Sequence, residues 1–185
     1  MSTIGTSLTT WEEFVQLPDE EWDNENGTHL ELHDGEVVVV APPKPVHQSK
    51  QGWIGKWFTL AANGHGYAMA EFYYRPAANL QFWRADVAYL PNEDWRALET
   101  EQYPVYAPPL IVEVLSPSNR RAKIQRQQIA AFSGGTREFW VVDLVRRTIE
   151  VTIPGRQSEI YAAGDSIPVT VLPGANFPVA ELFRA

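Results

Sequence analysis

The sequence predicts an α/β protein whose mixed β-sheet is flanked by helices, with antiparallel hairpins at both ends of the chain. The first observation is the stretch 108–118, an apolar run around Glu113 that turn residues bound on both sides. Because the run does not alternate, it indicates a strand buried on both faces. A helix-entry signal follows, then a helix to about Phe132 and a second apolar strand at 138–143. This order is typical of a βαβ crossover between parallel strands.

The N-terminal third begins with a short helix and a hairpin. Thr10 and Glu13 form a capping-box pattern, which predicts a helix that runs to about Leu17. Residues 30–33 and 36–40 then form two β-prone runs joined by Asp-Gly, a strong signal for a tight hairpin.

The middle of the chain is predicted to hold a helix and three strands. Apolar positions recur at helical spacing from residue 46 to about residue 60, and Asn-Gly-His-Gly ends the pattern. Residues 67–74, 78–83 and 85–90 are expected to be three separate strands. The stretch 92–107 is compatible with a short helix or with a loop.

A second hairpin is expected near the C-terminus, formed by residues 147–153 and 157–161 around Pro-Gly. A last helical turn is expected at 179–183. The sequence has no repeat, no low-complexity segment and no break in composition, so we expect one domain over residues 1–185.

Composition restricts the classes of function. The net charge of −8 argues against a broad cationic surface for nucleic acid. A local basic cluster is present at Arg120, Arg121, Lys123 and Arg126, which is either a solvated helix face or a phosphate-contacting patch. With no cysteine, disulfides and thiolate zinc sites are excluded. No apolar run of membrane-spanning length and no secretory leader pattern occur, so the cytoplasm is the expected location.

Three acids lie in or beside apolar strands: Glu31, Asp86 and Glu113. A charge in such a run is costly unless it is paired or binds a metal. One interpretation of Glu113 is a salt bridge to an arginine of the following helix. The other is a site in which two acids from adjacent strands bind a hard divalent cation, usually Mg²⁺, that can activate water.

Five segments resemble, in order, the Uma2 family (DUF820), and the likeness covers about residues 8–155. They contain the strings LELHDGEVV, PP…HQ, RADVAYL, IVEVLSPS and GTREFWVVD, at residues 30–38, 42–48, 84–90, 111–118 and 135–143. The resemblance implies the PD-(D/E)XK restriction-endonuclease-like fold and an endonuclease, dependent on Mg²⁺ or Mn²⁺, that hydrolyses phosphodiester bonds. It further implies Asp86 and Glu113 as metal ligands, Glu31 as a supporting acid, nucleic acid (first of all DNA) as substrate, and a homodimer.

The sequence departs from the family pattern at the catalytic lysine. Leu115 occupies the position of the lysine in the general nuclease motif, and the family places its lysine in the following helix, about four residues before an aromatic residue. Counting back from Phe132 gives Gln128, whereas counting forward from Ser116 gives Gln127. Gln128 lies on the stripe that contains Ile124 and is expected to point at the carboxylates.

The leading hypothesis is therefore a nuclease with an altered lysine position. Gln128 or Lys123 would take the role of the lysine, and the arginines Arg120, Arg121 and Arg126 would contact the phosphate backbone. His47, at the start of the second helix, is a peripheral candidate for metal or phosphate. The missing lysine and the net charge leave open a catalytically inactive module that binds nucleic acid or protein. A third hypothesis, a small-ligand protein, requires a pocket lined by Trp and Tyr away from Glu113.

Overall fold

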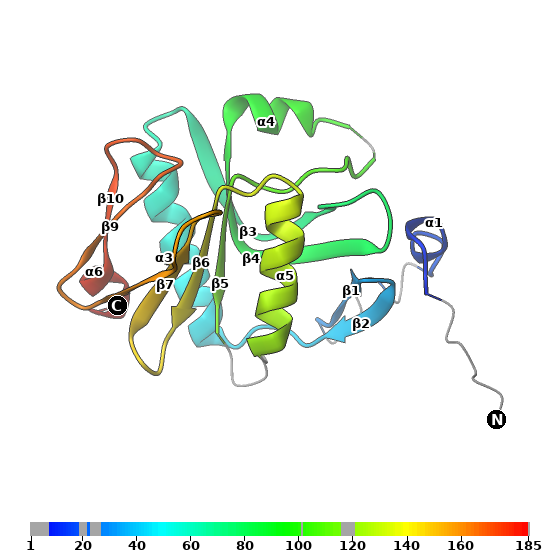
Figure 1. Ribbon diagram of the computed structural model, residues 1–185, viewed down its shortest axis with the longest axis horizontal. Coiled ribbons are helices and arrows are strands. Elements are labelled where there is room, and N and C mark those ends of the chain that lie inside the picture. The colour runs from blue at the N-terminus through cyan, green and yellow to red at the C-terminus, as the bar shows by residue number, and fades with distance from the viewer. Residues whose placement is uncertain (1–7, 19–21, 23–26, 101, 116–120, 185) are drawn as a thin grey trace.

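The computed structural model describes residues 8–18, 22, 27–100, 102–115 and 121–184 (Figure 1). Across these residues, eight strands form one sheet and two form a small separate sheet. The helices are α1 (Trp11–Phe14), α3 (Pro45–Ala61), α4 (Asn92–Ala97), α5 (Arg121–Ser133) and α6 (Val179–Arg184). The strands are β1 (His29–His33), β2 (Glu36–Val40), β3 (Gly66–Tyr74), β4 (Gln81–Pro91), β5 (Leu110–Val114), β6 (Glu138–Asp143), β7 (Thr148–Thr152), β8 (Glu159–Ala162), β9 (Ser166–Pro168) and β10 (Asn176–Pro178).

The sheet is mixed, as predicted. Its strand order is β2-β1-β4-β5-β6-β7-β8, and β3 pairs with β4. β5 and β6 are parallel, with α5 as the crossover between them, and the other described strand pairs are antiparallel. The two predicted hairpins, β1–β2 and β7–β8, are both present.

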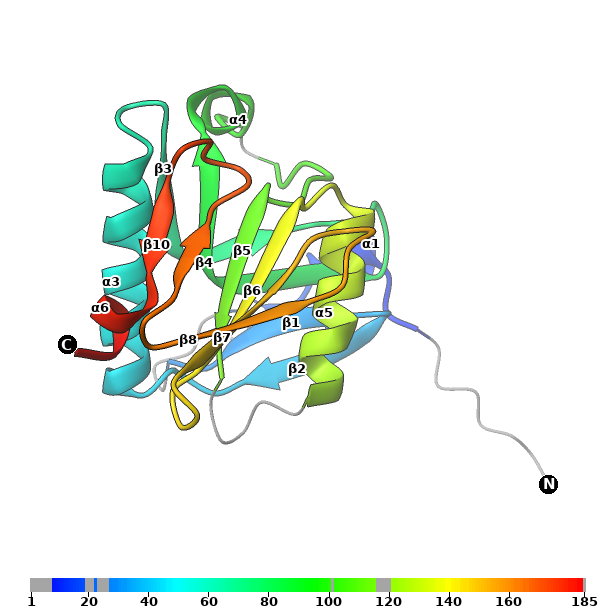
Figure 2. The same cartoon turned by 60° about the vertical axis from the view of Figure 1, so that its left-hand side comes forward.

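Helices cover both faces of the central strands. α3 and α5 lie on opposite sides of β5 and β6 (Figure 2). On the α3 side, Ile54 and Phe58 pack with Trp140 and with Phe177 of β10 in a buried cluster. On the α5 side, Ile124 and Ala131 pack in another cluster with strand residues that include Ile111 and Phe139. β5 is buried along its whole length between these layers, as the absence of alternation predicted.

Local signals account for the N-terminal elements. Thr10 and Glu13 make both hydrogen bonds of the capping box, but α1 ends at Phe14, three residues earlier than expected. The turn between β1 and β2 has φ of 52° at Asp34 and 81° at Gly35, the left-handed conformations that a tight hairpin requires.

Two details differ from the sequence-based expectation in the middle of the chain. Residues 78–83 and 85–90 do not form two strands, because β4 is continuous over Gln81–Pro91 and pairs with β3 along nearly its whole length. The turn lies before residue 81, so Asp86 interrupts the apolar pattern without ending the strand. The ambiguous stretch after Pro91 begins with a helix, α4. Among the described helices, none is long and apolar enough to cross a membrane.

Candidate active site

The sheet forks along one edge of β4. β1 pairs with β4 at Phe82, β5 pairs with it from Val87 onward, and residues 83–86 pair with neither strand. Consistently, β1 and β2 run at a steep angle to β5 and β6 (Figure 2). Continuing the β4–β5 register by one residue places Asp86 opposite Glu113. The fork therefore brings together acids that lie far apart in the sequence.

The carboxylates of Asp86 and Glu113 each accept a hydrogen bond from the backbone of the other acid's strand. The Asp86 N–H donates to Glu113 Oε1 at 3.3 Å, and the Val114 N–H donates to Asp86 Oδ2 at 2.6 Å. Glu113 is buried, and burial together with the negative charge of Asp86 raises its pKa well above the usual value, against the opposing charge of Lys123. The pair carries an electrostatic cost that a nearby cation would relieve.

Glu31 lies on β1 inside a buried cluster of nitrogen groups. Its carboxylate oxygens contact His29 Nε2 at 3.2 Å, His33 Nε2 at 2.5 Å and Lys123 Nζ at 3.2 Å. Burial alone would raise the pKa of Glu31, but the two histidine hydrogen bonds and the charge of Lys123 lower it below the normal value. The ring of Trp83 stacks on His33 at 3.6 Å and fixes its orientation. Glu31 is thus an ionised acceptor that holds Lys123 beside the fork.

Gln127, not Gln128, contacts the acids. Gln127 Nε2 donates to Glu113 Oε1 at 2.7 Å, and its side chain is 1% exposed. Gln128 is half-buried and lines a groove on the other side of α5. The expectation that Gln128 points at the carboxylates is therefore wrong, because the inward stripe of α5 runs through Ile124, Gln127 and Ala131. The register counted forward from Ser116 is the one whose side chain reaches Glu113.

The predicted arginines do not form one patch. Arg120 lies outside the described residues. Arg121 lines the same groove as Gln128. Arg126 faces the opposite way and lies 3.8 Å from Glu36 Oε2 of β2, with both side chains exposed. A salt bridge between Glu113 and an arginine of α5, one of the two interpretations of Glu113, is not among the contacts of the described residues.

Residues of α3 and β3 complete the site, and only His47 among them was a sequence candidate. His47 Nε2 lies 2.9 Å from Asp86 Oδ2. Gln51, one helical turn later and 1% exposed, donates its amide N–H groups to Asp86 Oδ1 at 2.9 Å and to Glu71 Oε1. Arg84 pairs with the same glutamate, Glu71, at 2.7 Å.

Glu71 itself has a φ of 56°, a left-handed conformation that is costly for a non-glycine residue. The β3–β4 ladder skips the Glu71–Asp86 pair, which lies between the pairs at Ala70 and Phe72. The i, i+4 spacing of His47 and Gln51 was a readable sequence signal. Glu71 had none, because cross-strand register brings it to Asp86.

The donor set fits a hard divalent cation held by Asp86 and Glu113. Two carboxylates from adjacent strands supply the oxygen ligands that Mg²⁺ prefers. The repulsion between Asp86 and Glu113, which helps to raise the pKa of Glu113, would be offset by the positive charge of such an ion. Within the described residues no group of three or more His, Cys, Asp or Glu is arranged to hold a metal. Water would therefore complete the coordination, which is usual for Mg²⁺.

The pocket that the small-ligand hypothesis requires also exists. It measures about 470 Å³ and lies along β3 and the segment after α4. Its walls include Tyr67 and Trp95, whose rings stack on each other at 4.1 Å, so these faces are already occupied. The described lining of this pocket includes Glu99 but no cluster of charged groups comparable to the one at the fork.

Comparisons with known proteins identify a family and a similar fold. A family model named Uma2, with the description "Putative restriction endonuclease", matches residues 11–180. No curated protein matches the sequence. The structure resembles that of a protein from Anabaena variabilis described as a putative nuclease belonging to DUF820, with a TM-score of 0.77 and 18% sequence identity. That match covers 94% of this chain and 96% of the other, so the fold is shared over nearly the whole length.

Proposed function

The chain belongs to the Uma2 family, and on this premise we propose that it is a metal-dependent nuclease whose site is the fork of the sheet. Asp86 and Glu113 would bind Mg²⁺ or Mn²⁺, and the substrate would be a phosphodiester bond of nucleic acid, first of all DNA. The observation that carries the proposal is that each carboxylate accepts a backbone N–H from the strand of the other acid, where β4 and β5 separate. A homodimer is a further expectation, which light scattering would measure.

A bound divalent ion would neutralise the carboxylate pair, lower the pKa of a bound water and polarise a phosphoryl oxygen. The residues of the chain would hold the two acids in position. Gln51 and the Val114 N–H hold Asp86 in one orientation, and Gln127 does the same for Glu113. Such fixed donors keep the acids in place before substrate arrives.

Lys123 is the cation that would take the role of the family lysine. Its side chain is 23% exposed, its ammonium lies 3.2 Å from Glu31 Oε2, and its charge acts on Glu113. Gln127 occupies the contact position but carries no charge, so it can orient a water and cannot stabilise negative charge on a phosphoryl group to the same degree. In this proposal Gln127 positions Glu113, and Lys123 supplies the positive charge.

The decisive experiment is Mn²⁺-supported cleavage of single- and double-stranded DNA by the wild type and by Asp86→Ala. We expect cleavage in the wild type and its loss in the variant. Calorimetric titration of Mn²⁺ into the same two proteins gives a readout that does not depend on turnover. If the wild type neither binds Mn²⁺ nor cleaves any substrate, the proposed function is wrong.

A second candidate is a nuclease-fold module that binds nucleic acid or protein without cleavage. The neutral side chain of Gln127 beside Glu113 favours it. Mn²⁺ binding that is lost in Asp86→Ala, with no cleavage in either protein, would support this alternative. Cleavage by the wild type that is abolished in Glu113→Ala would exclude it.

A further inference from the structure

Three polar side chains of β1 lie on one face of the strand, where Lys123 of α5 contacts them. They are His29, Glu31 and His33, which alternate along the strand and therefore project from the same side of it. All three are buried, with exposed fractions of 2%, 2% and 1%. The proposed function uses Glu31 and Lys123, but it gives the two histidines no role.

His33 and Lys123 share one oxygen of Glu31. His33 Nε2 lies 2.5 Å from Glu31 Oε2, and Lys123 Nζ lies 3.2 Å from the same atom. His29 Nε2 contacts the other oxygen, Oε1, at 3.2 Å. A carboxylate oxygen has room for two donors. It holds both well only if they are not both cations, because two positive charges at one buried oxygen repel each other.

The surroundings of His33 favour a neutral imidazole. Its ring stacks on Trp83, with 3.6 Å between the ring centroids and 11° between the planes, which holds it in one orientation. Nδ1 of His33 is buried and has no hydrogen-bond partner in the part of the chain that the structure describes. A neutral ring with its proton on Nε2 donates to Glu31. A charged ring would add an N–H at Nδ1 that has no acceptor, which is costly.

The charges around His33 come from both strands of the hairpin and from α5. The titratable or charged groups beside it are His29 and Glu31 on β1, Asp34 in the following turn, Glu36 on β2, and Lys123 and Arg126 on α5. On β4, Gln81 and Trp83 carry no charge. Burial lowers the pKa of His33, Glu31 raises it, and Lys123 and Arg126 lower it further. The net shift is downward, so His33 is neutral at neutral pH.

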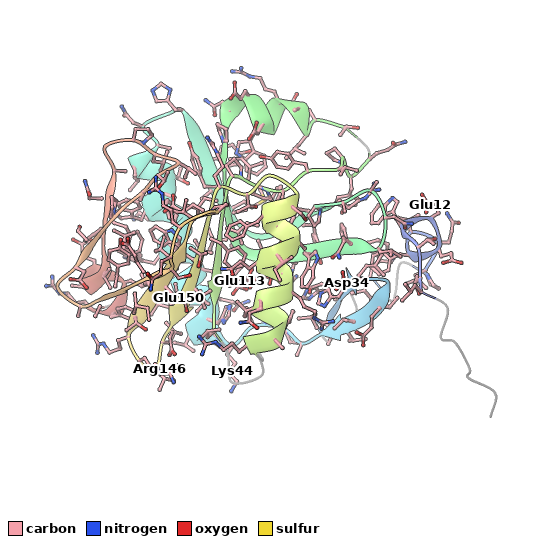
Figure 3. The ribbon with its side chains drawn as sticks, in the orientation of Figure 1. Glu12, Asp34, Lys44, Glu113, Arg146 and Glu150 are labelled. Carbon is pink, nitrogen blue, oxygen red and sulfur yellow. The ribbon has the colours of Figure 1, made fainter. Side chains whose placement is uncertain are left out.

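Lys123 is the member of the cluster that is able to move. Its side chain is 23% exposed, whereas those of His33 and Glu31 are 1% and 2% exposed. Figure 3 shows Asp34, the residue after His33, on one side of α5 and Glu113 on the other, so the helix that carries Lys123 stands between the cluster and the acids. A positive charge on the enclosed His33 would therefore displace Lys123 toward solvent.

We propose that His33 is a positioning residue that keeps Lys123 at Glu31 only while its imidazole is neutral. Protonation of His33 releases Lys123 and removes its charge from beside Glu113. The inference rests on the proposed nuclease function, in which Lys123 supplies the positive charge, and deepens it by naming the group that controls this charge. Because the coupling is reciprocal, loss of Lys123 must also make His33 easier to protonate.

The reciprocal effect is measured by NMR titration of the ¹⁵N-labelled imidazoles in metal-free protein with EDTA. Lys123→Met should raise the proton affinity of His33 by about tenfold or more. Arg121→Met, which removes an exposed arginine of the same helix, is the matched control and should leave the affinity unchanged. The same spectra should show His33 with its proton on Nε2 at neutral pH. Unchanged proton affinity in Lys123→Met would overturn the inference.

The release of Lys123 is measured by ¹⁵N relaxation of its ammonium group between about pH 7 and pH 4, which crosses the range in which histidine titrates. In the wild type the ammonium should be ordered at neutral pH and mobile in acid. In His33→Gln, whose side-chain amide donates but does not titrate, it should stay ordered. His65→Gln, at an exposed histidine after α3, should behave like the wild type. An ammonium that stays ordered in the acidic wild type would contradict the proposal.

Thermal unfolding of each variant checks that the fold is retained, and the Lys123→Met titration stands by itself if His33→Gln does not fold. At saturating Mn²⁺ and DNA, kcat of the wild type should fall as Lys123 is released, and the fall should lie at lower pH in His33→Gln. The NMR results do not depend on turnover. A wild type that cleaves while Lys123 stays ordered removes the role of His33 alone. Release of Lys123 in a wild type that never cleaves retains the coupling and removes the nuclease.

Discussion

At the scale of one residue, Glu113 is a site residue whose ionised form destabilises the folded protein. It is a buried acid whose nearest partners are an amide and a backbone N–H, with Asp86 as a like-charged neighbour. Ionisation in such surroundings is unfavourable because desolvation and repulsion both act against the charged form. Glu31, equally buried, has two histidines and a lysine around it instead. The two acids therefore have pKa values displaced in opposite directions.

Stability should fall with rising pH because of Glu113. Its pKa in the folded protein lies above the unfolded value of about 4.3, so between these values the folded state binds more protons than the unfolded state. Stability is therefore lost as pH rises toward the folded pKa. Glu113→Gln should stabilise the metal-free protein by about 1 kcal/mol or more at pH 8, with a smaller gain at pH 5.

Urea unfolding at the two pH values measures the difference. Glu150→Gln removes one strand carboxylate away from Asp86 and is the control. If Glu113→Gln raised the free energy of unfolding equally at pH 5 and pH 8, the raised pKa of Glu113 would be contradicted.

Gln127→Lys should restore a cation at the contact with Glu113. The ammonium would lie where the amide now donates at 2.7 Å, in surroundings with little water to screen it. We expect kcat for Mn²⁺-supported cleavage to rise by about tenfold or more. Gln128→Lys adds the same charge one position along α5 and should leave kcat unchanged, because that side chain faces the groove. An equal effect of the two variants would count against the assigned register.

At the scale of elements, α3 joins β3 and β4 at the site. The amide of Gln51 lies between Asp86 and Glu71, and Arg84 holds Glu71 from the other side. The left-handed backbone of Glu71 is tolerated because these contacts fix its side chain. The helix therefore determines the orientation of Asp86, although it supplies no acid.

Gln51→Leu tests that role with little change in volume. Loss of the shared donor would leave two carboxylates facing each other, so Mn²⁺ affinity and cleavage should both fall by about 10–100-fold. Gln48→Leu, an exposed glutamine one turn earlier on the same helix, should change neither quantity. Calorimetry and cleavage rates measure the effect. Unchanged Mn²⁺ affinity in Gln51→Leu would remove Gln51 from the positioning of Asp86.

At the scale of the whole molecule, the site forms where the sheet divides. β4 pairs with β1 at one end and with β5 at the other, and α5 spans the gap with Lys123 and Gln127. The acids thus come from three strands on both sides of the fork, and the fork exists only in the folded chain. A divalent ion that binds there should stabilise the native state as a whole.

Metal addition is therefore expected to raise stability by mass action. At Mn²⁺ concentrations 100 times the Kd, the free energy of unfolding should rise by about 2.7 kcal/mol, and EDTA should reverse the gain. Asp86→Asn should show no such gain, while its stability without metal stays close to that of the wild type or above it. Thermal or urea unfolding measures both. A gain of equal size in Asp86→Asn would place the metal elsewhere.

The sequence alone was sufficient for local features and for the family. The capping box at Thr10, the Asp-Gly hairpin and the doubly buried strand around Glu113 follow from short-range patterns, and the structure confirms them. The resemblance to Uma2 depended on short motifs in order along the chain, and the family match confirms it. These features depend on residues that lie close together in the sequence, so they can be predicted without the tertiary structure.

Only the tertiary structure decided which side chains meet. Helical spacing alone did not distinguish Gln127 from Gln128, because both lie three or four residues from Ile124, and packing of α5 against the fork selected Gln127. Glu71 reaches Asp86 through the β3–β4 register, and Arg126 turns to Glu36 because β2 lies on that side of α5. Such contacts depend on the relative placement of elements far apart in the chain, and no local pattern encodes that placement.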